Sequence, residues 1–266
     1  MTSTLHRTQS VVQQREGYTL HILPVLEDNY AYIIEWDGRA AVVDLPDGDP
    51  VLRYLKQQGL SLELVLNTHA HFDHVAGNLE VKEATGCTIV GPATDCIPGL
   101  DRPVREGDVV VAGPLQFTVL ETPGHTRHDI AFYATSGHVL FSGDTLFAGG
   151  CGRLFECPED TMWDSLVKLR DLPDETEVFP GHEYAADNLA FAHQYLPEHH
   201  QIAERLNEAC ALRANQLPVV PTSIGREKAT NIFFLADDPE IQAVLNLGGC
   251  EPAVAFGEIR KRKDRF

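Results

Sequence analysis

The sequence T-H-A-H-F-D-H at residues 68–74 brings three histidines and one aspartate together directly after an apolar run at residues 62–67. The apolar run predicts a buried strand, and the segment that follows predicts a turn into a helix. Imidazole nitrogens and carboxylate oxygens are ligands that zinc, iron and manganese accept. An extended backbone points His69 and His71 the same way, whereas the last two polar residues follow the start of the turn. The motif therefore predicts two adjacent metal positions at the end of a strand.

Length and composition restrict the kind of protein. The chain has 266 residues, which predicts one or two domains of about 150 residues and a core that folds without a structural metal or disulfide. A bound metal is therefore expected to serve catalysis. The formal charge of −18 argues against nucleic-acid or acidic-membrane partners. Six cysteines without a C-x-x-C pair and the lack of a long apolar run lead us to expect a cytoplasmic monomer with reduced thiols.

Three further apolar runs each end in a turn that carries one ligand-type residue: 117–121 before His125, 139–142 before Asp144, and 177–179 before His182. A glycine precedes each of these residues and would let the backbone turn sharply. α/β enzymes build their sites from such turns, which meet at one edge of a sheet. The candidate metal ligands are therefore His69, His71, Asp73, His74, His125, Asp144 and His182. One four-coordinate ion cannot use seven ligands, whereas two ions that share a carboxylate can.

The pattern of apolar residues divides the chain into three parts. Residues 1–17 predict a flexible tail. Mixed strands and helices over residues 18–182 predict an α+β catalytic domain in which two sheets pack together with helices outside. Residues 183–266 predict a small helical domain. Helices are expected at residues 49–56, 75–84, 187–195, 201–216 and 238–247.

The motifs at the predicted strand ends, T-H-A-H-F-D-H, P-G-H, G-D-T and P-G-H-E, resemble those of the metallo-β-lactamase superfamily. Further segments resemble the glyoxalase II family, the hydroxyacylglutathione hydrolases: G-D-T-L-F at 143–147, G-C-G-R at 150–153, G-H-E-Y at 181–184, N-L-A-F-A at 188–192 and R-x-x-K-D-x-F at 260–266. The resemblance covers the chain from residue 18 onward. It implies a four-layer αβ/βα sandwich followed by a small α-helical domain that binds glutathione.

The resemblance also implies a role for each candidate ligand. One metal would take His69, His71 and His125, the second would take Asp73, His74 and His182, and Asp144 would bridge the two. We expect two divalent ions, zinc in the first place, with iron or manganese as alternatives.

The implied activity is hydrolysis of S-(2-hydroxyacyl)glutathione, with S-D-lactoylglutathione as substrate and glutathione and D-lactate as products. This reaction is the second step of methylglyoxal detoxification. A metal pair can lower the pKa of a bound water to about 7, so the expected nucleophile is a bridging hydroxide held by Asp144 and the metal pair. A metal can also polarise the thioester carbonyl. A thiolate leaves readily, which fits a sequence in which no unassigned acid stands out as a general acid.

The end of this acidic chain carries five cations within residues 260–265. The resemblance implies that Arg260 and Lys263 bind the glycine carboxylate of glutathione, with Arg153 and Tyr184 as further contacts. Arginine can grip a carboxylate through two hydrogen bonds, whereas lysine acts as a point charge.

Three points at the substrate end stay open. Some family members carry a tyrosine where this chain has Phe155, so the hydroxyl of that tyrosine is lost here. The basic residues at the chain end have an alternative role, in which they complement a helix dipole or form a solvated tail. His128, three residues after a candidate ligand, is either a support for that ligand or a structural histidine.

Other activities share the metal motif. The main alternative is a mono-iron glutathione persulfide dioxygenase of the same superfamily, which retains much of the H-x-H-x-D-H signature. The complete second ligand set and the R-x-x-K ending favour the hydrolase. Lactamases of the superfamily often place Arg where His74 stands, lactonases lack the basic tail, and a nuclease would be expected to carry a basic surface.

Overall fold

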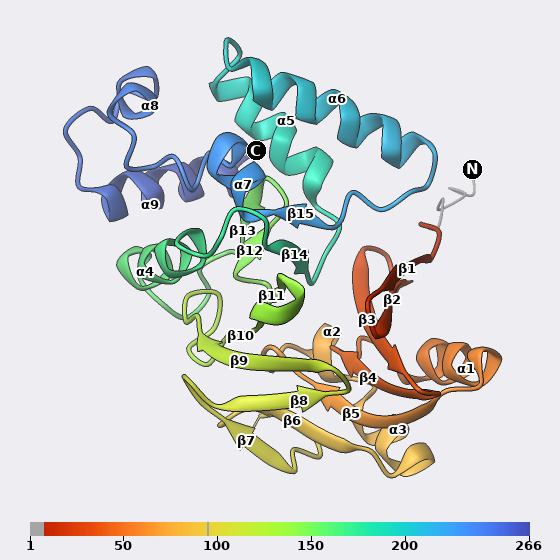
Figure 1. Ribbon diagram of the computed structural model, residues 1–266. Helices are drawn as coiled ribbons and strands as arrows, with labels where there is room; N and C mark the ends of the chain where they lie inside the picture. Colours follow the sequence, from red (N-terminus) through yellow and green to blue (C-terminus); the bar gives the residue numbers. More distant parts are fainter. Residues whose placement is uncertain (1–7, 95) are drawn as a thin grey trace, which may run out of the picture.

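Two β-sheets form the centre of the structure, a computed structural model that describes residues 8–94 and 96–266 (Figure 1). The first sheet has seven strands in the order β1 to β7. Strands β1 to β4 pair antiparallel, and the pairs from β4 to β7 are parallel. Its strands are β1 (Val11–Arg15), β2 (Tyr18–Val25), β3 (Asn29–Trp36), β4 (Arg39–Val43), β5 (Ser61–Leu66), β6 (Thr88–Pro92) and β7 (Arg102–Val104).

The second sheet has six strands in the order β15-β14-β11-β10-β9-β8. Strands β11 and β14 pair in parallel, and the other neighbours are antiparallel. Its strands are β8 (Val109–Ala112), β9 (Leu115–Glu121), β10 (Ile130–Ala134), β11 (Val139–Gly143), β14 (Glu177–Pro180) and β15 (Thr222–Ser223). A separate two-stranded hairpin follows β11 and consists of β12 (Leu146–Phe147) and β13 (Gly150–Cys151).

Aromatic side chains fill the space between the two sheets. The ring of Tyr32 on β3 lies 5.3 Å from that of Phe141 on β11 and 5.4 Å from that of Phe179 on β14. Its hydroxyl donates to the carbonyl of Pro180 at 2.6 Å. Burial of large rings supplies much of the hydrophobic free energy of a core, and a satisfied hydroxyl avoids the desolvation penalty. This contact fastens the two sheets together directly before the turn that carries His182.

Helices cover the outer face of each sheet. On the first sheet, α1 (Gly48–Gln58) and α3 (Asn78–Thr85) bury Val51, Leu55 and Val81 in a common apolar cluster. On the second sheet, α4 (Glu159–Arg170) contributes Met162 and Leu166 to another. The order helix, sheet, sheet, helix confirms the predicted four-layer sandwich.

The chain after β14 is mainly helical, and in Figure 1 its helices gather at one end of the sheets. They are α5 (Ala185–Tyr195), α6 (His200–Ala214), α7 (Ile224–Thr230), α8 (Pro239–Val244) and α9 (Pro252–Lys263). This part also supplies β15 to the second sheet and shares the apolar cluster around α4. The boundary between residues 182 and 183 therefore stays a prediction, because packing is continuous across it.

The structure differs from the sequence expectations at the N-terminal tail and at the helix that follows the histidine motif. Within the predicted flexible tail, residues 1–7 lie outside the described part, but Val11–Arg15 forms the edge strand β1, whose side chains alternate between half-buried and exposed. The single helix expected at residues 75–84 is instead split into α2 (Phe72–Val75) and α3. The break lies at Gly77, where a Cβ would meet the backbone nitrogen of Gly48 at 2.6 Å. Among the described residues, none of the helices is both long and apolar enough to cross a membrane.

Candidate metal centre and substrate pocket

The histidine cluster lies at the end of β5, and Asp44 at the end of β4 holds it in place. The carboxylate of Asp44 accepts from the backbone nitrogen of Thr68 at 2.9 Å and from its hydroxyl at 2.8 Å. The same carboxylate accepts from Nδ1 of His74 at 2.8 Å. Asp44 itself has a φ of 55°, a conformation that is uncommon for residues other than glycine. Parallel pairing of β4 with β5 places these groups side by side.

Hydrogen bonds fix which nitrogen of each buried imidazole carries its proton. Acceptors face Nδ1 of His74, His182 and His125: the carboxylates of Asp44 and Asp28, both at 2.8 Å, and the carbonyl of Arg153 at 2.9 Å. Nδ1 of His69 lies 3.0 Å from the Thr68 hydroxyl, whose own proton goes to Asp44. Because each Nδ1 donates, each Nε2 presents a lone pair when the ring is neutral, which is the form that binds a metal ion.

These lone pairs converge on two points. In one group, Nε2 of His125 lies 2.9 Å from Nδ1 of His71, and His69 belongs to the same group, whose ligand atoms all lie within 4.8 Å of one another. In the other, Nε2 of His182 lies 3.2 Å from Nε2 of His74 and 3.3 Å from Oδ2 of Asp73. Facing lone pairs repel each other unless a proton or a metal ion lies between them.

Asp144 lies between the two groups. Its Oδ2 is 3.4 Å from Nε2 of His125 and 3.3 Å from Nε2 of His182, and its Oδ1 is 3.4 Å from Nε2 of His74. The structure thus brings all seven candidate ligands together from four separate turns. Two of the three groups of described residues that could hold a metal ion have the members that the family resemblance implied, and the third consists of Asp44, His69 and His74.

The donor set fits metal ions on a second ground. Nε2 of His69 and Oδ1 of Asp144 are buried and have no hydrogen-bond partner in the described part of the chain. Buried polar atoms are almost always paired, so unpaired ones at a site of ligand type point to a bound group. The fold and these clusters together indicate a dinuclear metal site.

The charged side chains of the centre raise the pKa of a histidine and lower the pKa of an aspartate. Burial lowers the pKa of His74, but Asp144 and Asp44 outweigh burial and raise this pKa to about 10. Burial would raise the pKa of Asp144, yet the charges of His74 and His182 hold it well below its usual range. By contrast, burial lowers the pKa of His69 well below its usual value. Carboxylates that stay ionised in a buried site attract positive charge.

Two of the glycines that precede ligands are required for a reason that the sequence did not reveal. Gly143 has a φ of 51°, as expected for a sharp turn. Gly124 and Gly181 do not have a positive φ; instead, a Cβ at Gly181 would collide with Oδ1 of Asp144, and one at Gly124 would meet Sδ of Met162 at 2.6 Å. Close packing, rather than turn geometry, excludes a side chain at these two positions.

A pocket of about 480 Å³ opens beside the histidine cluster. Its lining includes five of the metal-ligand candidates, among them Asp73 and Asp144. Arg153, Arg260 and Lys263 also line it. The structure therefore places the predicted substrate cations in the same cavity as the predicted metal ligands.

The cations that line this pocket already have acidic partners within the protein. Arg260 is buried, donates to the carbonyl of Cys151 at 2.9 Å and lies 3.0 Å from a carboxylate oxygen of Asp264. Lys263 forms an ion pair with Asp187. The solvated tail considered as an alternative is thus wrong for Arg260, which belongs to α9 and packs 5.0 Å above the ring of Phe233.

Aromatic rings also line the pocket. Tyr184 stacks on His182 with ring centroids 4.8 Å apart and an interplanar angle of 5°. Phe155 is 62% exposed, and its ring meets those of His71 and His125 edge-on at 5.8 and 5.2 Å. Because phenylalanine has no hydroxyl, it presents only an apolar surface to the pocket.

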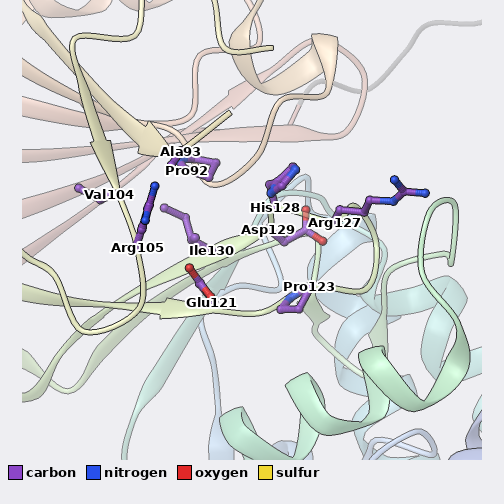
Figure 2. A pocket seen from close by; sticks show the side chains of 10 residues that line it. All are labelled: Pro92, Ala93, Val104, Arg105, Glu121, Pro123, Arg127, His128, Asp129 and Ile130. Atoms are coloured by element: carbon purple, nitrogen blue, oxygen red, sulfur yellow. The ribbon is translucent and has the colours of Figure 1, made fainter. Parts of the chain in front are cut away.

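His128 lies in a different cavity, a hollow of about 340 Å³ between β7, β9 and the turn after β9. Figure 2 shows its ring lining this hollow together with Arg105 and Asp129. No hydrogen bond joins the His128 ring to a metal-ligand candidate within residues 8–94 and 96–266. His128 is therefore not a support for His125.

Sequence reasoning missed the groups that orient the imidazoles. Asp28 and Asp44 were not identified, although each accepts from an Nδ1 of a ligand candidate. Asn29, whose side chain donates to the carboxylate of Asp73 at 3.2 Å, was missed as well. Their only sequence signal was position, since each lies at the end of a strand or directly before one.

Comparison with known proteins agrees with this geometry. Residues 26–182 match the family model of the metallo-β-lactamase superfamily, and residues 183–266 match that of the hydroxyacylglutathione hydrolase C-terminus. The hydroxyacylglutathione hydrolase of Rhodospirillum rubrum is 44% identical over 93% of this chain and 98% of its own length. That of Methylococcus capsulatus is 46% identical over 92% and 97%.

Solved structures show the same fold. ETHE1 from Myxococcus xanthus is 27% identical, with a TM-score of 0.59 over 96% of this chain and 97% of that one. TTHA1623, solved in a di-iron-bound form, is 28% identical with a TM-score of 0.57 over 79% of this chain and 96% of that one.

The four-layer fold and the paired histidine and aspartate groups define a metallo-β-lactamase superfamily protein. The match over the C-terminal helices and the identity to curated relatives are more specific. Within the superfamily, the chain belongs to the hydroxyacylglutathione hydrolase family, as predicted.

Proposed function

We propose that this protein hydrolyses S-(2-hydroxyacyl)glutathione thioesters, with S-D-lactoylglutathione as its main substrate, to glutathione and a 2-hydroxy acid. The observation that carries the proposal is the cavity that is lined both by five of the seven ligand candidates and by a cluster of cations. The ligand candidates would take the reacting thioester, and the cations would take a carboxylate of glutathione. The family names of the relatives agree with this activity.

We propose two zinc ions as the cofactor, with iron or manganese as alternatives that the same ligands accept. His69, His71 and His125 would hold one ion, and Asp73, His74 and His182 the other, with Asp144 between them. When bound, such a pair supplies an activated water at neutral pH and polarises the thioester carbonyl. Asp28 and Asp44 would keep His182 and His74 in the tautomer that presents Nε2.

The protein's own residues bind and orient the substrate. The guanidinium of Arg260 and the ammonium of Lys263 would hold the glycine carboxylate of glutathione, and Arg153, which is two-thirds exposed, would reach the same end of the ligand. Tyr184, held flat against His182, can donate its hydroxyl to the glutathione part. Binding at a distance from the reacting carbon fixes the thioester relative to the metal centre.

No dedicated general acid is required for the leaving group. Of the described acidic residues that line the pocket, Asp187 and Asp264 pair with the cations, and Asp73 and Asp144 belong to the metal centre. A thiolate leaves without being protonated first, so a thioester suits this pocket better than an amide does.

We further propose that the protein acts as a cytoplasmic monomer without a nucleic-acid or membrane partner, in agreement with a formal charge of −18. In that setting it would catalyse the second step of methylglyoxal detoxification. The mono-iron persulfide dioxygenase considered above is not favoured, because a second full ligand group is present.

The deciding experiment measures hydrolysis of S-D-lactoylglutathione before and after chelation, with metal analysis of the same sample. We expect two metal ions per chain, loss of turnover on chelation and recovery when zinc is returned. Oxygen consumption with glutathione persulfide, without thioester hydrolysis, would support the dioxygenase instead.

A further inference from the structure

A buried ion pair connects two C-terminal helices at a distance from the metal centre. Arg205 on α6 and Glu227 on α7 are 3% and 0% exposed and form a salt bridge. One carboxylate oxygen of Glu227 also accepts from the hydroxyl of Thr222 at 2.6 Å. The other accepts from the backbone nitrogen of Gly149 at 2.9 Å and from the side chain of Asn231 at 2.8 Å. The carboxylate is thus fully satisfied by four donors.

The stability of the fold by itself does not explain why a buried ion pair lies here. Removing two charges from water costs several kcal/mol per ion, and well-packed apolar residues in the same place are often as stable or more so. What an apolar pair could not do is accept the hydrogen bond from Gly149. This bond leaves the helical part of the chain and ends in the β12–β13 hairpin.

The side chains of Glu227 and Asn231 hold the hairpin turn at two successive residues. Gly149 has a φ of 70° and donates to Glu227, and the carbonyl of Gly150 accepts from Asn231 at 3.0 Å. A Cβ at Gly150 would fall against the amide of Asn188. The turn therefore has little freedom as long as the carboxylate is present.

Both strands of the hairpin contribute to the substrate pocket. Phe147 at the end of β12 meets the rings of Tyr184 and His182 edge-on, with centroids 5.2 and 6.0 Å away. The carbonyl of Cys151 in β13 accepts from Arg260 at 2.9 Å. A shift of the hairpin would therefore displace Arg260.

We propose that Glu227, neutralised by Arg205, is a positioning residue for the substrate pocket. It fixes the β12–β13 hairpin through Gly149, and the hairpin in turn places the guanidinium of Arg260 for the carboxylate of the ligand. Neither Glu227 nor Arg205 lines the pocket itself. The inference rests on the proposed function, because it assumes that the pocket binds glutathione.

The test compares two double variants that both remove the buried charges. Arg205→Met/Glu227→Leu fills the space with apolar groups and deletes the acceptor for Gly149. Arg205→Met/Glu227→Gln retains an amide oxygen that can accept from Gly149, while its NH₂ group can donate to Thr222. Because neither variant leaves a buried charge without a partner, both are expected to fold.

The readouts are the Kd for S-methylglutathione, which has no thioester to hydrolyse, and amide hydrogen exchange of residues 146–152. We expect the leucine variant to raise Kd on the order of tenfold, since the hydrogen bond that holds Gly149 and the hairpin is lost, and to exchange these amides faster. Its kcat and metal content should stay near those of the wild type. The glutamine variant should keep Kd within about twofold.

Equal Kd values for the two double variants, whether low or high, would overturn the proposal. The control is a surface ion pair. Arg226, which also lies on α7, pairs with Glu208, and Arg226→Gln should leave Kd unchanged. If the wild type binds S-methylglutathione and the two variants do not differ, only this inference is wrong. If the wild type does not bind S-methylglutathione, both the proposed function and the inference are wrong.

Discussion

Asp28 accepts a hydrogen bond at 2.8 Å from Nδ1 of His182, a residue 154 positions later in the chain. The carboxylate can only accept, so this contact sets the tautomer of the ring and aims Nε2 at Asp73 and Asp144. His74 has the same arrangement with Asp44. Each of these two imidazoles is thus oriented by a carboxylate that is not among the seven predicted ligands.

Removal of this support should weaken metal binding. Asp28→Ala is expected to lower metal affinity by about 10- to 100-fold, as loss of a carboxylate behind a metal-binding histidine usually does. Asp28→Asn, whose amide oxygen can still accept from Nδ1, should cost less. Competition with a chelator of known affinity measures both. Equal affinity in the wild type and in Asp28→Ala would show that the contact does not orient the ligand.

Asp144 is expected to be required by both metals. Asp144→Asn keeps the shape of the side chain but removes the charge that lies between the two groups. Metal content by elemental analysis should fall below two ions per chain, and turnover should drop on the order of a hundredfold or more. Asp129→Asn, a buried acid outside the histidine cluster, is the matched control and should keep its metal. Full metal content in Asp144→Asn would contradict bridging.

Arg260 should act on substrate binding more than on chemistry. Arg260→Ala is expected to raise KM on the order of tenfold or more, with a much smaller fall in kcat. The reason is that Arg260 would bind the carboxylate of glutathione equally in the ground state and in the transition state. Arg262→Ala is the control, since Arg262 lies on the same helix but bonds the carbonyl of Leu245. Equal losses in kcat and kcat/KM would argue against this role.

Phe155 offers a gain-of-contact test. Phe155→Tyr restores the hydroxyl found in some family members at a side chain that is 62% exposed at the pocket. One neutral hydrogen bond contributes about 0.5–1.5 kcal/mol, so KM for the thioester should fall by about two- to tenfold. Steady-state kinetics with S-D-lactoylglutathione measures this change. An unchanged KM would mean that the ligand passes this position without contact.

Asp129 should make stability depend on pH. Burial raises the pKa of its carboxyl from 3.8 to about 7, although hydrogen bonds from Thr126 oppose the shift. Between these values the folded protein holds a proton that the unfolded chain has released, so the free energy of unfolding falls as the pH rises from about 4 to about 7. The full effect is at most about 4 kcal/mol.

Asp129→Asn removes this titration while an amide can still bond to Thr126. The free energy of unfolding of the variant, relative to that of the wild type, should therefore increase between pH 5 and pH 7.5. Urea unfolding at the two pH values, with equal metal loading, checks the prediction. Parallel pH profiles would show that Asp129 ionises normally in the folded protein.

Much of the fold could be predicted because its strands are short and strongly apolar. The segments expected at 117–121, 139–142 and 177–179 lie in β9, β11 and β14. Strand β1 was missed because its side chains are half-buried or exposed at a sheet edge, so that its sequence looks polar. Helix α9 was missed as well, because its position at the pocket depends on contacts with α4 rather than on its own pattern.

The sequence by itself determined the family, the fold class and the seven candidate ligands, because a metal centre demands particular side chains at strand ends. Only the tertiary structure decided what orients them, namely Asp28 and Asp44 and the carbonyl of Arg153. The physical reason is that ligands are recognised by residue type and local spacing. Their supports are ordinary carboxylates and backbone groups, which gain a role only when folding brings them within hydrogen-bond distance.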